Sequence, residues 1–288
     1  MKPARVLTIA GSDSGGGAGI QGDLKTITVL GGFGMSVVTA LTAQNSLGVH
    51  GIFDVPPEFV EKQFDAVMQD IGADAAKTGM LARPDILRAV IGKIRQYRID
   101  KLVVDPVMVA KGGTLLLRGE IMDLLRTQLI PLAFVVTPNI PEAEVLAGVK
   151  IAAAEDVREA ARRIRQMGAR HVVVKGGHLE GAAVDVFYDG NTFHEFKAER
   201  IDTSNTHGTG CTFSAALATG IAQGKEILDA ISQAKEYITE AIRNSFALGS
   251  GHGPLNHLAP VAGKWEKRLH PGAAGVGKSS FIGIIKND

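Results

Sequence analysis

The chain has 288 residues, of which 45% are hydrophobic and 21% are charged, a composition that excludes an intrinsically disordered protein. Its 31 basic and 30 acidic side chains give a net charge of +1, which excludes a strongly basic nucleic-acid binder. The single cysteine cannot form an internal disulfide, and no apolar run approaches the roughly 18 residues of a membrane helix. We therefore expect a cytoplasmic protein that has no membrane partner.

Short apolar runs and helical periodicities alternate along the chain up to Lys175. Strands are expected at residues 6–10, 36–43, 52–55, 75–80, 102–104, 134–137 and 171–175. Helices are expected between them, at about residues 20–30, 58–71, 84–97, 119–130, 140–147 and 155–167. Because strands that alternate with helices favour parallel pairing, the pattern predicts an α/β protein with a mostly parallel sheet covered on both faces.

The alternation of predicted strands and helices ends after Lys175. Residues 184–188 and 192–196 flank Asp189-Gly190-Asn191, which predicts a hairpin and hence an antiparallel extension of the sheet. Two helices, at about residues 209–223 and 226–247, follow. No linker divides residues 1–258, so we expect one domain there, and residues 259–288 are expected to form a tail of unknown role.

Glycine is in excess, with 35 residues, and its first cluster is GSDSGGGAG at residues 11–19. Glycine allows the backbone to approach a ligand closely, and ligands bind at the carboxyl ends of strands in open α/β sheets. No acidic residue ends a second strand about 20 residues later, so this loop is a poor dinucleotide fingerprint. The alternative interpretation is a flexible turn between a strand and a helix.

A second cluster, NTHGTGCT at residues 205–212, opens a long apolar helix. The first amides of a helix lack intrahelical partners and carry partial positive charge, which favours an oxyanion or a transferring phosphoryl group. Gly208 and Gly210 would let the backbone close around such a group. Cys211 lies in the first turn, where the helix dipole lowers the pKa of a thiol, although a lone cysteine can equally be a small packing residue.

A third cluster, GAAGVGKS at residues 272–279, satisfies the pattern G-x-x-x-x-G-K-[ST] of the P-loop. That motif binds nucleotide only between a strand and a helix, with an acidic metal ligand further along the chain. Pro271 precedes the segment, and only nine residues follow Ser279. We therefore expect it not to bind nucleotide, and a nucleotide-binding regulatory module that uses it is kept as a rival function.

Three segments together resemble one family: GSDSGGGAGIQGDLKT, TALTAQNSLGV and SNTHGTGCTFSAA. In this order they are similar to the hydroxymethylpyrimidine/phosphomethylpyrimidine kinases of thiamine biosynthesis, in the ribokinase-like superfamily. The segments KTGML, VVDPVM, TPNIPEAE and VVVKGGH agree, and the resemblance runs from about residue 4 to His257. The tail from residue 259 has no counterpart in it.

The resemblance implies a three-layer α/β/α ribokinase-like fold and a homodimer. It implies the transfer of the γ-phosphate of ATP, with Mg²⁺, to the hydroxymethyl group of 4-amino-5-hydroxymethyl-2-methylpyrimidine. The same family also phosphorylates the resulting monophosphate to the diphosphate. The nearest alternative is a pyridoxal or pyridoxine kinase of the same superfamily.

The resemblance assigns catalytic roles around the second glycine cluster. The amides of Gly208 and Gly210 form the anion hole, and Cys211 stands where sugar kinases carry an aspartate, which makes it the candidate base. A thiolate serves as base near pH 7 only if the helix terminus lowers the pKa of the thiol. Lys175 would neutralise the ATP phosphates; alternatively it is a strand-end lysine that reaches solvent. Thr209 is assigned to the nucleotide.

Carboxylates that end neighbouring strands are candidate metal ligands. Asp105 ends one strand, and Asn139 and Glu142 follow the next as N-x-x-E. Mg²⁺ keeps several waters, so a few oxygen ligands suffice. By resemblance Glu142 acts through those waters, and Asp105 and Asn139 lie near the phosphates. Asn139 is alternatively an ordinary helix N-cap.

Gln44 is the candidate acceptor-binding residue. A 4-aminopyrimidine presents an N–H donor beside a ring-nitrogen acceptor, and a carboxamide matches both. Asp23 would accept a hydrogen bond from the substrate hydroxyl or order the site. By resemblance the pyrimidine pocket is lined by Gly11, Met80 and Val107. His207 and Lys235 are weaker candidates. His207 is alternatively a structural loop residue. Lys235 is assigned to the nucleotide and is alternatively a solvated helix residue.

Overall fold

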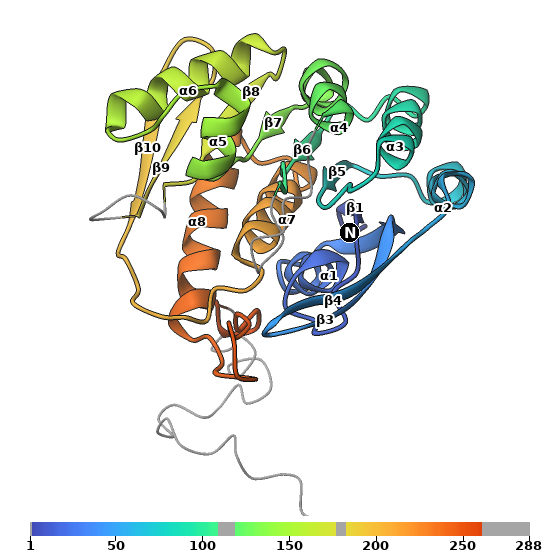
Figure 1. Cartoon of the computed structure of the whole chain (residues 1–288), viewed down its shortest axis with the longest axis horizontal. Coiled ribbons are helices and arrows are strands. Elements are labelled where there is room, and N and C mark those ends of the chain that lie inside the picture. The colour runs from blue at the N-terminus through green and yellow to red at the C-terminus, as the bar shows by residue number, and fades with distance from the viewer. Residues whose placement is uncertain (1, 109–118, 177–182, 261–288) are drawn as a thin grey trace, which may run out of the picture.

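The computed structural model of the protein describes residues 2–108, 119–176 and 183–260. Its centre is an eight-stranded sheet in the order β10-β9-β8-β7-β6-β5-β1-β2 (Figure 1). The parallel strands are β1 (Arg5–Ala10), β2 (Phe33–Val38), β5 (Ala75–Thr78), β6 (Leu102–Val104), β7 (Val135–Val136) and β8 (His171–Val174). Strands β9 (Ala183–Tyr188) and β10 (Phe193–Ala198) add an antiparallel hairpin, so the mostly parallel sheet and its extension are confirmed.

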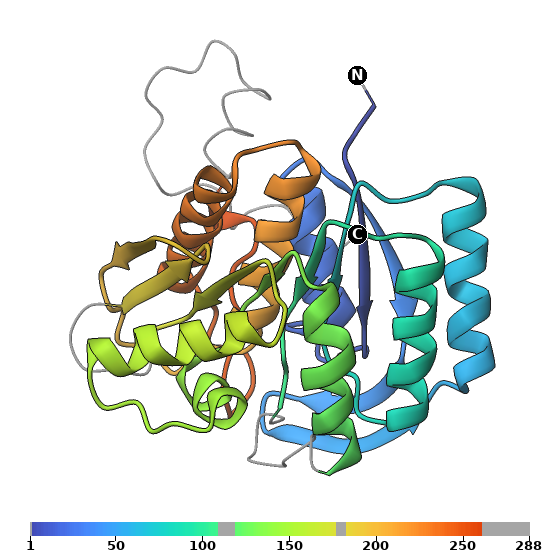
Figure 2. The same ribbon diagram turned by 90° about the horizontal axis from the view of Figure 1, so that it is seen from above.

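Helices cover both faces of this sheet, which confirms the three-layer α/β/α prediction. One layer contains α2 (Pro57–Asp70), α3 (Pro84–Gln96), α4 (Glu120–Leu124), α5 (Ile140–Ala147) and α6 (Ala154–Gln166). The other contains α1 (Gly19–Val29), α7 (Thr209–Ala222) and α8 (Ile227–Arg243), and Figure 2 shows the strands between the two layers. Alternating strand residues supply the two cores: Leu102 and Val104 pack on the first layer, and Val103 packs on the second.

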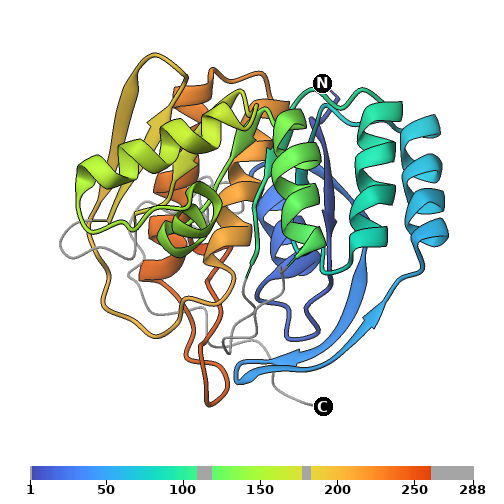
Figure 3. The ribbon, with the colours of Figure 1, turned by 45° about the horizontal axis from the view of Figure 1, so that its top comes forward.

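The strand predicted at residues 36–43 is two strands. Strand β2 ends at Val38, opposite Ala10, the last residue of β1, so the chain has no further partner in the main sheet. After Thr39 the chain forms β3 (Ala40–Asn45), which pairs with β4 (Gly48–Asp54) in a separate antiparallel hairpin. Figure 3 shows this hairpin beyond the ends of the main strands.

Two predicted helices have different bounds. The segment 119–130 is α-helical only to Leu124; a π-turn (Leu125–Leu129) and a 3-10 turn (Ile130–Leu132) follow, because Pro131 lacks the N–H that a regular helix needs. Helix α8 ends at Arg243, and the chain folds back so that the Phe246 amide donates to the carbonyl of Pro254.

The P-loop-like segment at 272–279 and the tail from residue 261 lie outside the described residues. None of the helices in the described ranges has both the length and the apolar character needed to cross a membrane.

Candidate active site

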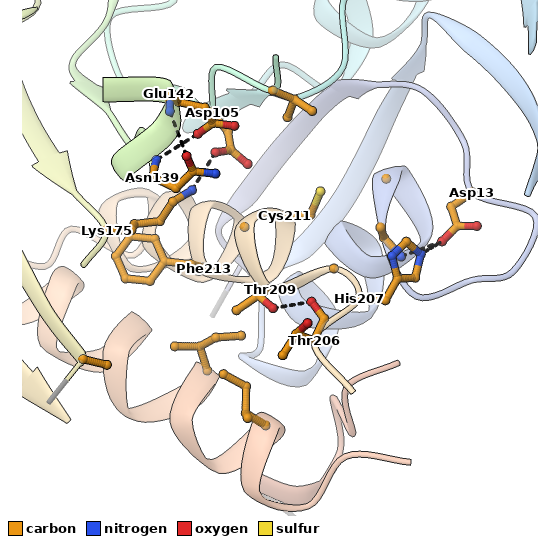
Figure 4. Close-up of a pocket in the computed structure, with 18 of the residues that line it drawn as sticks. Asp13, Asp105, Asn139, Glu142, Lys175, Thr206, His207, Thr209, Cys211 and Phe213 are labelled. Carbon is orange, nitrogen blue, oxygen red and sulfur yellow. Dashed lines mark hydrogen bonds and ion pairs between the residues drawn. The ribbon is translucent and has the colours of Figure 1, made fainter. Parts of the chain in front are cut away.

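A cavity of about 720 Å³ opens at the carboxyl ends of the parallel strands. It lies where the loop after β1, the hairpin β3–β4 and the first turn of α7 meet. The predicted site residues that line it are Gly11, Gln44, Met80, Asp105, Val107, Asn139, Glu142, Lys175, Gly208, Thr209, Gly210, Cys211 and Lys235. Figure 4 shows two groups of side chains, with Asp13 and His207 apart from Asp105, Asn139, Glu142 and Lys175.

The first turn of α7 depends on its glycines. Gly208 precedes the helix with a φ of 86°, and a Cβ there would overlap the carbonyl oxygen of Gly17. A Cβ on Gly210 would lie 3.4 Å from Nζ of Lys175 and 3.5 Å from a carboxylate oxygen of Asp105. The N-cap Gly208 makes no side-chain capping bond, the Thr209 amide donates to the Thr206 carbonyl at 3.4 Å, and Gly208, Thr209 and Gly210 all line the cavity. This geometry suits a phosphoryl group.

Lys175 and Asp105 form a buried ion pair beside that turn, with Nζ 2.9 Å from Oδ1. The hydroxyls of Ser214 and Thr137 also donate to the Asp105 carboxylate. Burial raises the pKa of Asp105, but the ammonium groups of Lys175 and Lys77 outweigh it and hold the pKa below its ordinary value. The side chain of Lys175 is 15% exposed, so the strand-end lysine does not extend into solvent.

Asn139 and Glu142 form a capping box at the start of α5. The Glu142 amide donates to Oδ1 of Asn139 at 2.9 Å, and the Asn139 amide donates to Oε2 of Glu142 at 2.8 Å. The predicted N-cap is therefore confirmed. Burial raises the pKa of Glu142 to about 7, an effect that the Lys175 ammonium opposes and the Asp105 carboxylate reinforces.

Asp23 is a correction to the predicted acceptor set. Asp23 is on the buried face of α1, and its carboxylate oxygens Oδ1 and Oδ2 lie 3.0 and 3.1 Å from Nζ of Lys77. The carboxylate also accepts a hydrogen bond from the Thr8 hydroxyl. It does not line the cavity, so a direct bond to substrate is excluded in this arrangement, whereas its second predicted role, to order the site, fits the geometry. Sequence reasoning missed Lys77, although a lysine inside the buried strand AAKT signals a partner.

The thiol of Cys211 differs from expectation in its ionisation. Burial raises its pKa to about 11; Lys77 lowers it, while Asp23 and Asp105 raise it further. The helix terminus therefore does not make Cys211 a thiolate near neutral pH. Its side chain nevertheless faces the cavity beside the first turn of α7 (Figure 4).

Asp13, which sequence reasoning missed, organises the other end of the cavity. Its carboxylate accepts hydrogen bonds from the amides of Gly15, Gly17 and Ala18, and Oδ2 lies 2.7 Å from Nε2 of His207. An aspartate followed two residues later by glycine is the available sequence signal, because its side chain bonds the backbone of such turns. His207 is thus buried and paired.

Gln44 lies next to this pair. Its Nε2 is 3.4 Å from Nε2 of His207, and its backbone N–H and carbonyl both bond to the hydroxyl of Ser14. On the wall of the cavity, a Cβ on Gly11 would lie 2.5 Å from Cε of Met80, so the glycine leaves room for that side chain. The hairpin and the loop after β1 are held together at this point.

Lys235 is buried rather than solvated, so the alternative of a solvated helix residue is wrong. Its Nζ lies 2.9 Å from the carboxylate of Asp185 on β9, and Asp185 also accepts a hydrogen bond from the Gly176 amide. This pair ties α8 to the end of β8. Among the described residues, no group of three or more acidic, histidine or cysteine side chains could by itself hold a metal ion.

The family model described as phosphomethylpyrimidine kinase matches residues 13–256. The thiamine biosynthesis bifunctional protein ThiED of Geobacter sulfurreducens is 57% identical over 88% of this chain, which spans 52% of that protein's length. A hydroxymethylpyrimidine/phosphomethylpyrimidine kinase of Bacillus subtilis is 49% identical, with 90% of this chain and 96% of that protein covered. A structure of Bacillus subtilis pyridoxal kinase with ADP matches with a TM-score of 0.84 and 44% identity, over 90% of this chain and 98% of that one.

Proposed function

The chain belongs to the phosphomethylpyrimidine kinase family, and from this premise we propose that it transfers the γ-phosphate of ATP to two successive acceptors. The first is the hydroxymethyl group of 4-amino-5-hydroxymethyl-2-methylpyrimidine, and the second is the resulting monophosphate. One observation carries the proposal: a single cavity joins a carboxamide, Gln44, to a helix N-terminus flanked by a buried lysine. The acceptor and the phosphates thus have separate, connected binding regions.

The phosphate region provides positioning and charge neutralisation, which phosphoryl transfer chiefly needs. The amides of Gly208 and Gly210 would hold the transferring group, and Lys175 would neutralise the developing charge. Lys175 is already desolvated and charged, since burial lowers its pKa but Asp105 and Glu142 raise it above its ordinary value. Lys235 and the apolar residues Ile238 and Ile242 extend the cavity along α8, where we assign the nucleoside part of ATP.

Mg²⁺ fits the oxygen donors at this end of the cavity. Asp105, Asn139 and Glu142 line the cavity within one cluster, and Mg²⁺ characteristically uses one or two carboxylates together with substrate phosphates and water. Asp105 and, through water, Glu142 would hold the ion, which when bound neutralises phosphate charge.

Cys211 is proposed to contact the acceptor oxygen as a neutral thiol. A loose phosphoryl-transfer transition state requires little deprotonation of the attacking hydroxyl, so a thiolate is not needed before transfer. The second transfer requires even less from a base, since the second ionisation of a phosphate monoester has a pKa of about 6. Its oxygen is already charged near neutral pH.

The pyrimidine is proposed to lie between Met80 and Val107, with its amino group and ring nitrogen on the Gln44 carboxamide. Because Gly11 has no side chain, it leaves room for Met80 at this part of the cavity wall. A pyridoxal or pyridoxine kinase is the second candidate, because a pyridoxal kinase shares the fold at 44% identity. Gln44 favours the pyrimidine, since its paired donor and acceptor match an aminopyrimidine edge.

We also propose that the chain acts as a cytoplasmic homodimer, with residues 1–258 as its kinase domain. Leu41 and Phe53 face each other across the hairpin and are 50% and 67% exposed, an apolar pair that a second copy would cover. Light scattering after gel filtration tests the homodimer by measuring the masses of the wild type, Leu41→Ser and Phe53→Ser. A monomeric wild type whose mass neither substitution changes would reject it. ATP and a lone cysteine both fit a reducing cytoplasm.

A substrate screen tests the activity. The full chain with ATP and Mg²⁺ is assayed in parallel on hydroxymethylpyrimidine, its monophosphate and pyridoxal. We expect turnover of both pyrimidines, and Gln44→Leu to raise their KM about tenfold while the KM for ATP is unchanged. Gln96→Leu, at the exposed end of α3, is the matched control. No turnover of either pyrimidine would reject the proposal.

A further inference from the structure

A fourth glycine-rich segment, GSGHGP at residues 249–254, follows α8 and has no role in the function proposed above. It lies between two parts of the active site that are far apart in the sequence. One is the tip of the hairpin β3–β4, and the other is the loop 203–207 that leads into α7 (Figures 1 and 3).

Its contacts with the hairpin all involve Ser46, the first residue of the hairpin turn. The His252 amide donates to the Ser46 carbonyl at 3.0 Å, and the Gly251 amide donates to the Ser46 hydroxyl at 3.2 Å. A Cβ on Gly249 or on Gly251 would overlap Ser46. Gly251 is therefore required by the close approach of the two backbones, whereas Gly249 has a φ of 80° and makes room for the Ser46 side chain.

The same segment is fixed at its other side. Nδ1 of His252 lies 2.9 Å from the Ser204 carbonyl, and the His207 amide donates to the Gly253 carbonyl at 3.2 Å. A Cβ on Gly253 would overlap Asn205. The segment is thus anchored on the loop that carries His207, whose ring pairs with Asp13.

Between these anchors the hairpin carries Gln44, two residues before Ser46. The middle of strand β3 is held at Thr42 and Gln44 by Ser12 and Ser14 of the loop after β1, whereas the tip of the hairpin is held by residues 251 and 252. We propose that residues 249–254 are a latch, which fixes the hairpin tip and thereby positions Gln44 over the acceptor region of the cavity. Gly251 and Ser46 are its positioning residues.

The catalytic consequence rests on the proposed function, but the latch itself has a test that does not. Gly251→Ala pushes the Ser46 backbone away and breaks both hydrogen bonds. Gly251 is not among the described glycines with a positive φ, so the substitution acts through space rather than backbone strain. Gly92→Ala on α3 is the matched control, because a Cβ there meets nothing within 4 Å.

Hydrogen–deuterium exchange of the full chain measures the latch directly. In Gly251→Ala we expect faster exchange at residues 40–54 than in the wild type or Gly92→Ala, with exchange of the central strands unchanged. Unchanged exchange at 40–54 overturns the latch. Should Gly251→Ala fail to fold, Ser46→Ala removes the hydroxyl acceptor alone and is judged by the same comparison, with a smaller increase expected.

Kinetics tests the positioning of Gln44. Gly251→Ala is expected to raise the KM for both pyrimidine acceptors about tenfold, and Ser46→Ala about threefold, with kcat and the KM for ATP nearly unchanged. Faster hairpin exchange with an unchanged acceptor KM overturns the positioning role. If the wild type turns over neither pyrimidine, the proposed function fails, and the exchange experiment still decides whether the latch exists.

Discussion

Asp13→Asn is the most informative single substitution, because it preserves shape and removes one acceptor from a buried carboxylate. Asp13 is 1% exposed and accepts four hydrogen bonds, one on Oδ1 and three on Oδ2. If the asparagine keeps its oxygen on the Oδ2 side, its amide group faces the Gly15 N–H, donor against donor. The partly buried Gly15 N–H then loses its acceptor, and the bonds from Gly17, Ala18 and His207 lose a charged acceptor, which together cost about 1–3 kcal/mol of folding free energy.

Urea denaturation at pH 7 measures this loss, and Asp189→Asn is the matched control. Asp189 also accepts two backbone N–H bonds, but in the exposed turn between β9 and β10, so its replacement is expected to cost under about 1 kcal/mol. We also expect Asp13→Asn to lower kcat, since a neutral amide oxygen holds the loop after β1 and the His207–Gly208 turn together less strongly than the carboxylate does. Equal stabilities of Asp13→Asn and the wild type would refute this account of the loop.

The difference in stability between the wild type and Asp13→Asn is expected to shrink as the pH falls. Burial raises the pKa of Asp13, but the bonds from His207 and the loop amides outweigh it and hold the pKa below its ordinary value. The stabilisation is therefore present above the unfolded pKa of about 3.9 and is lost as the pH falls through the lower folded pKa. The gap between wild type and Asp13→Asn should close below about pH 4.

Three further substitutions are expected to have distinct effects. Cys211→Ala should lower kcat for both transfers by less than about tenfold, because a neutral thiol supplies a contact and no base catalysis, which a coupled ADP assay with each acceptor measures; a loss of about 100-fold or more confined to the first transfer would contradict the neutral-thiol role. Lys77→Met should lower the free energy of unfolding by about 3–5 kcal/mol, because it leaves the buried Asp23 carboxylate unpaired. The double variant Lys77→Met with Asp23→Leu should regain part of the lost stability, which thermal melts measure. Burial raises the pKa of Glu142 to about 7, so its protonated form stabilises the fold in the absence of bound metal. This contribution to the free energy of unfolding is complete below the unfolded pKa of about 4.5 and is lost as the pH rises to about 7. Glu142→Gln should therefore flatten the dependence of stability on pH, which denaturation at a series of pH values measures.

Most of the fold was predictable because buried parallel strands and their helices leave strong periodic signals. The failures occur where a tertiary constraint replaces the local one. Residues 36–43 are continuously strand-like, yet the chain leaves the sheet at Thr39 because β1 offers no partner beyond Ala10. No pattern within the segment records the length of a neighbouring strand.

The candidate site was predictable where a residue stands in a motif and lines the cavity, and hidden where a residue is positioned by a partner far away in the sequence. Gln44 and Lys175 stand in motifs and line the cavity. Lys77 and Asp23, 54 positions apart, are visible as a pair only in three dimensions. The sequence places Asp23 on the helix after the glycine loop, but it cannot say which face of that helix is buried.

Cys211 shows how magnitudes decide between two local rules. A helix N-terminus favours a negative charge by about 0.3–1 kcal/mol, and one pKa unit corresponds to about 1.4 kcal/mol, so the dipole shifts a pKa by about one unit or less. Burial shifts a pKa in the opposite direction for a thiol, by up to about 3–5 units when burial is complete, and the partly buried Cys211 experiences a fraction of that shift. Burial therefore wins, and the pKa rises to about 11 despite Lys77 nearby. Under the proposed function, a neutral thiol would add no negative charge beside the phosphates, whereas a thiolate there would repel the group that the amides of Gly208 and Gly210 are proposed to hold.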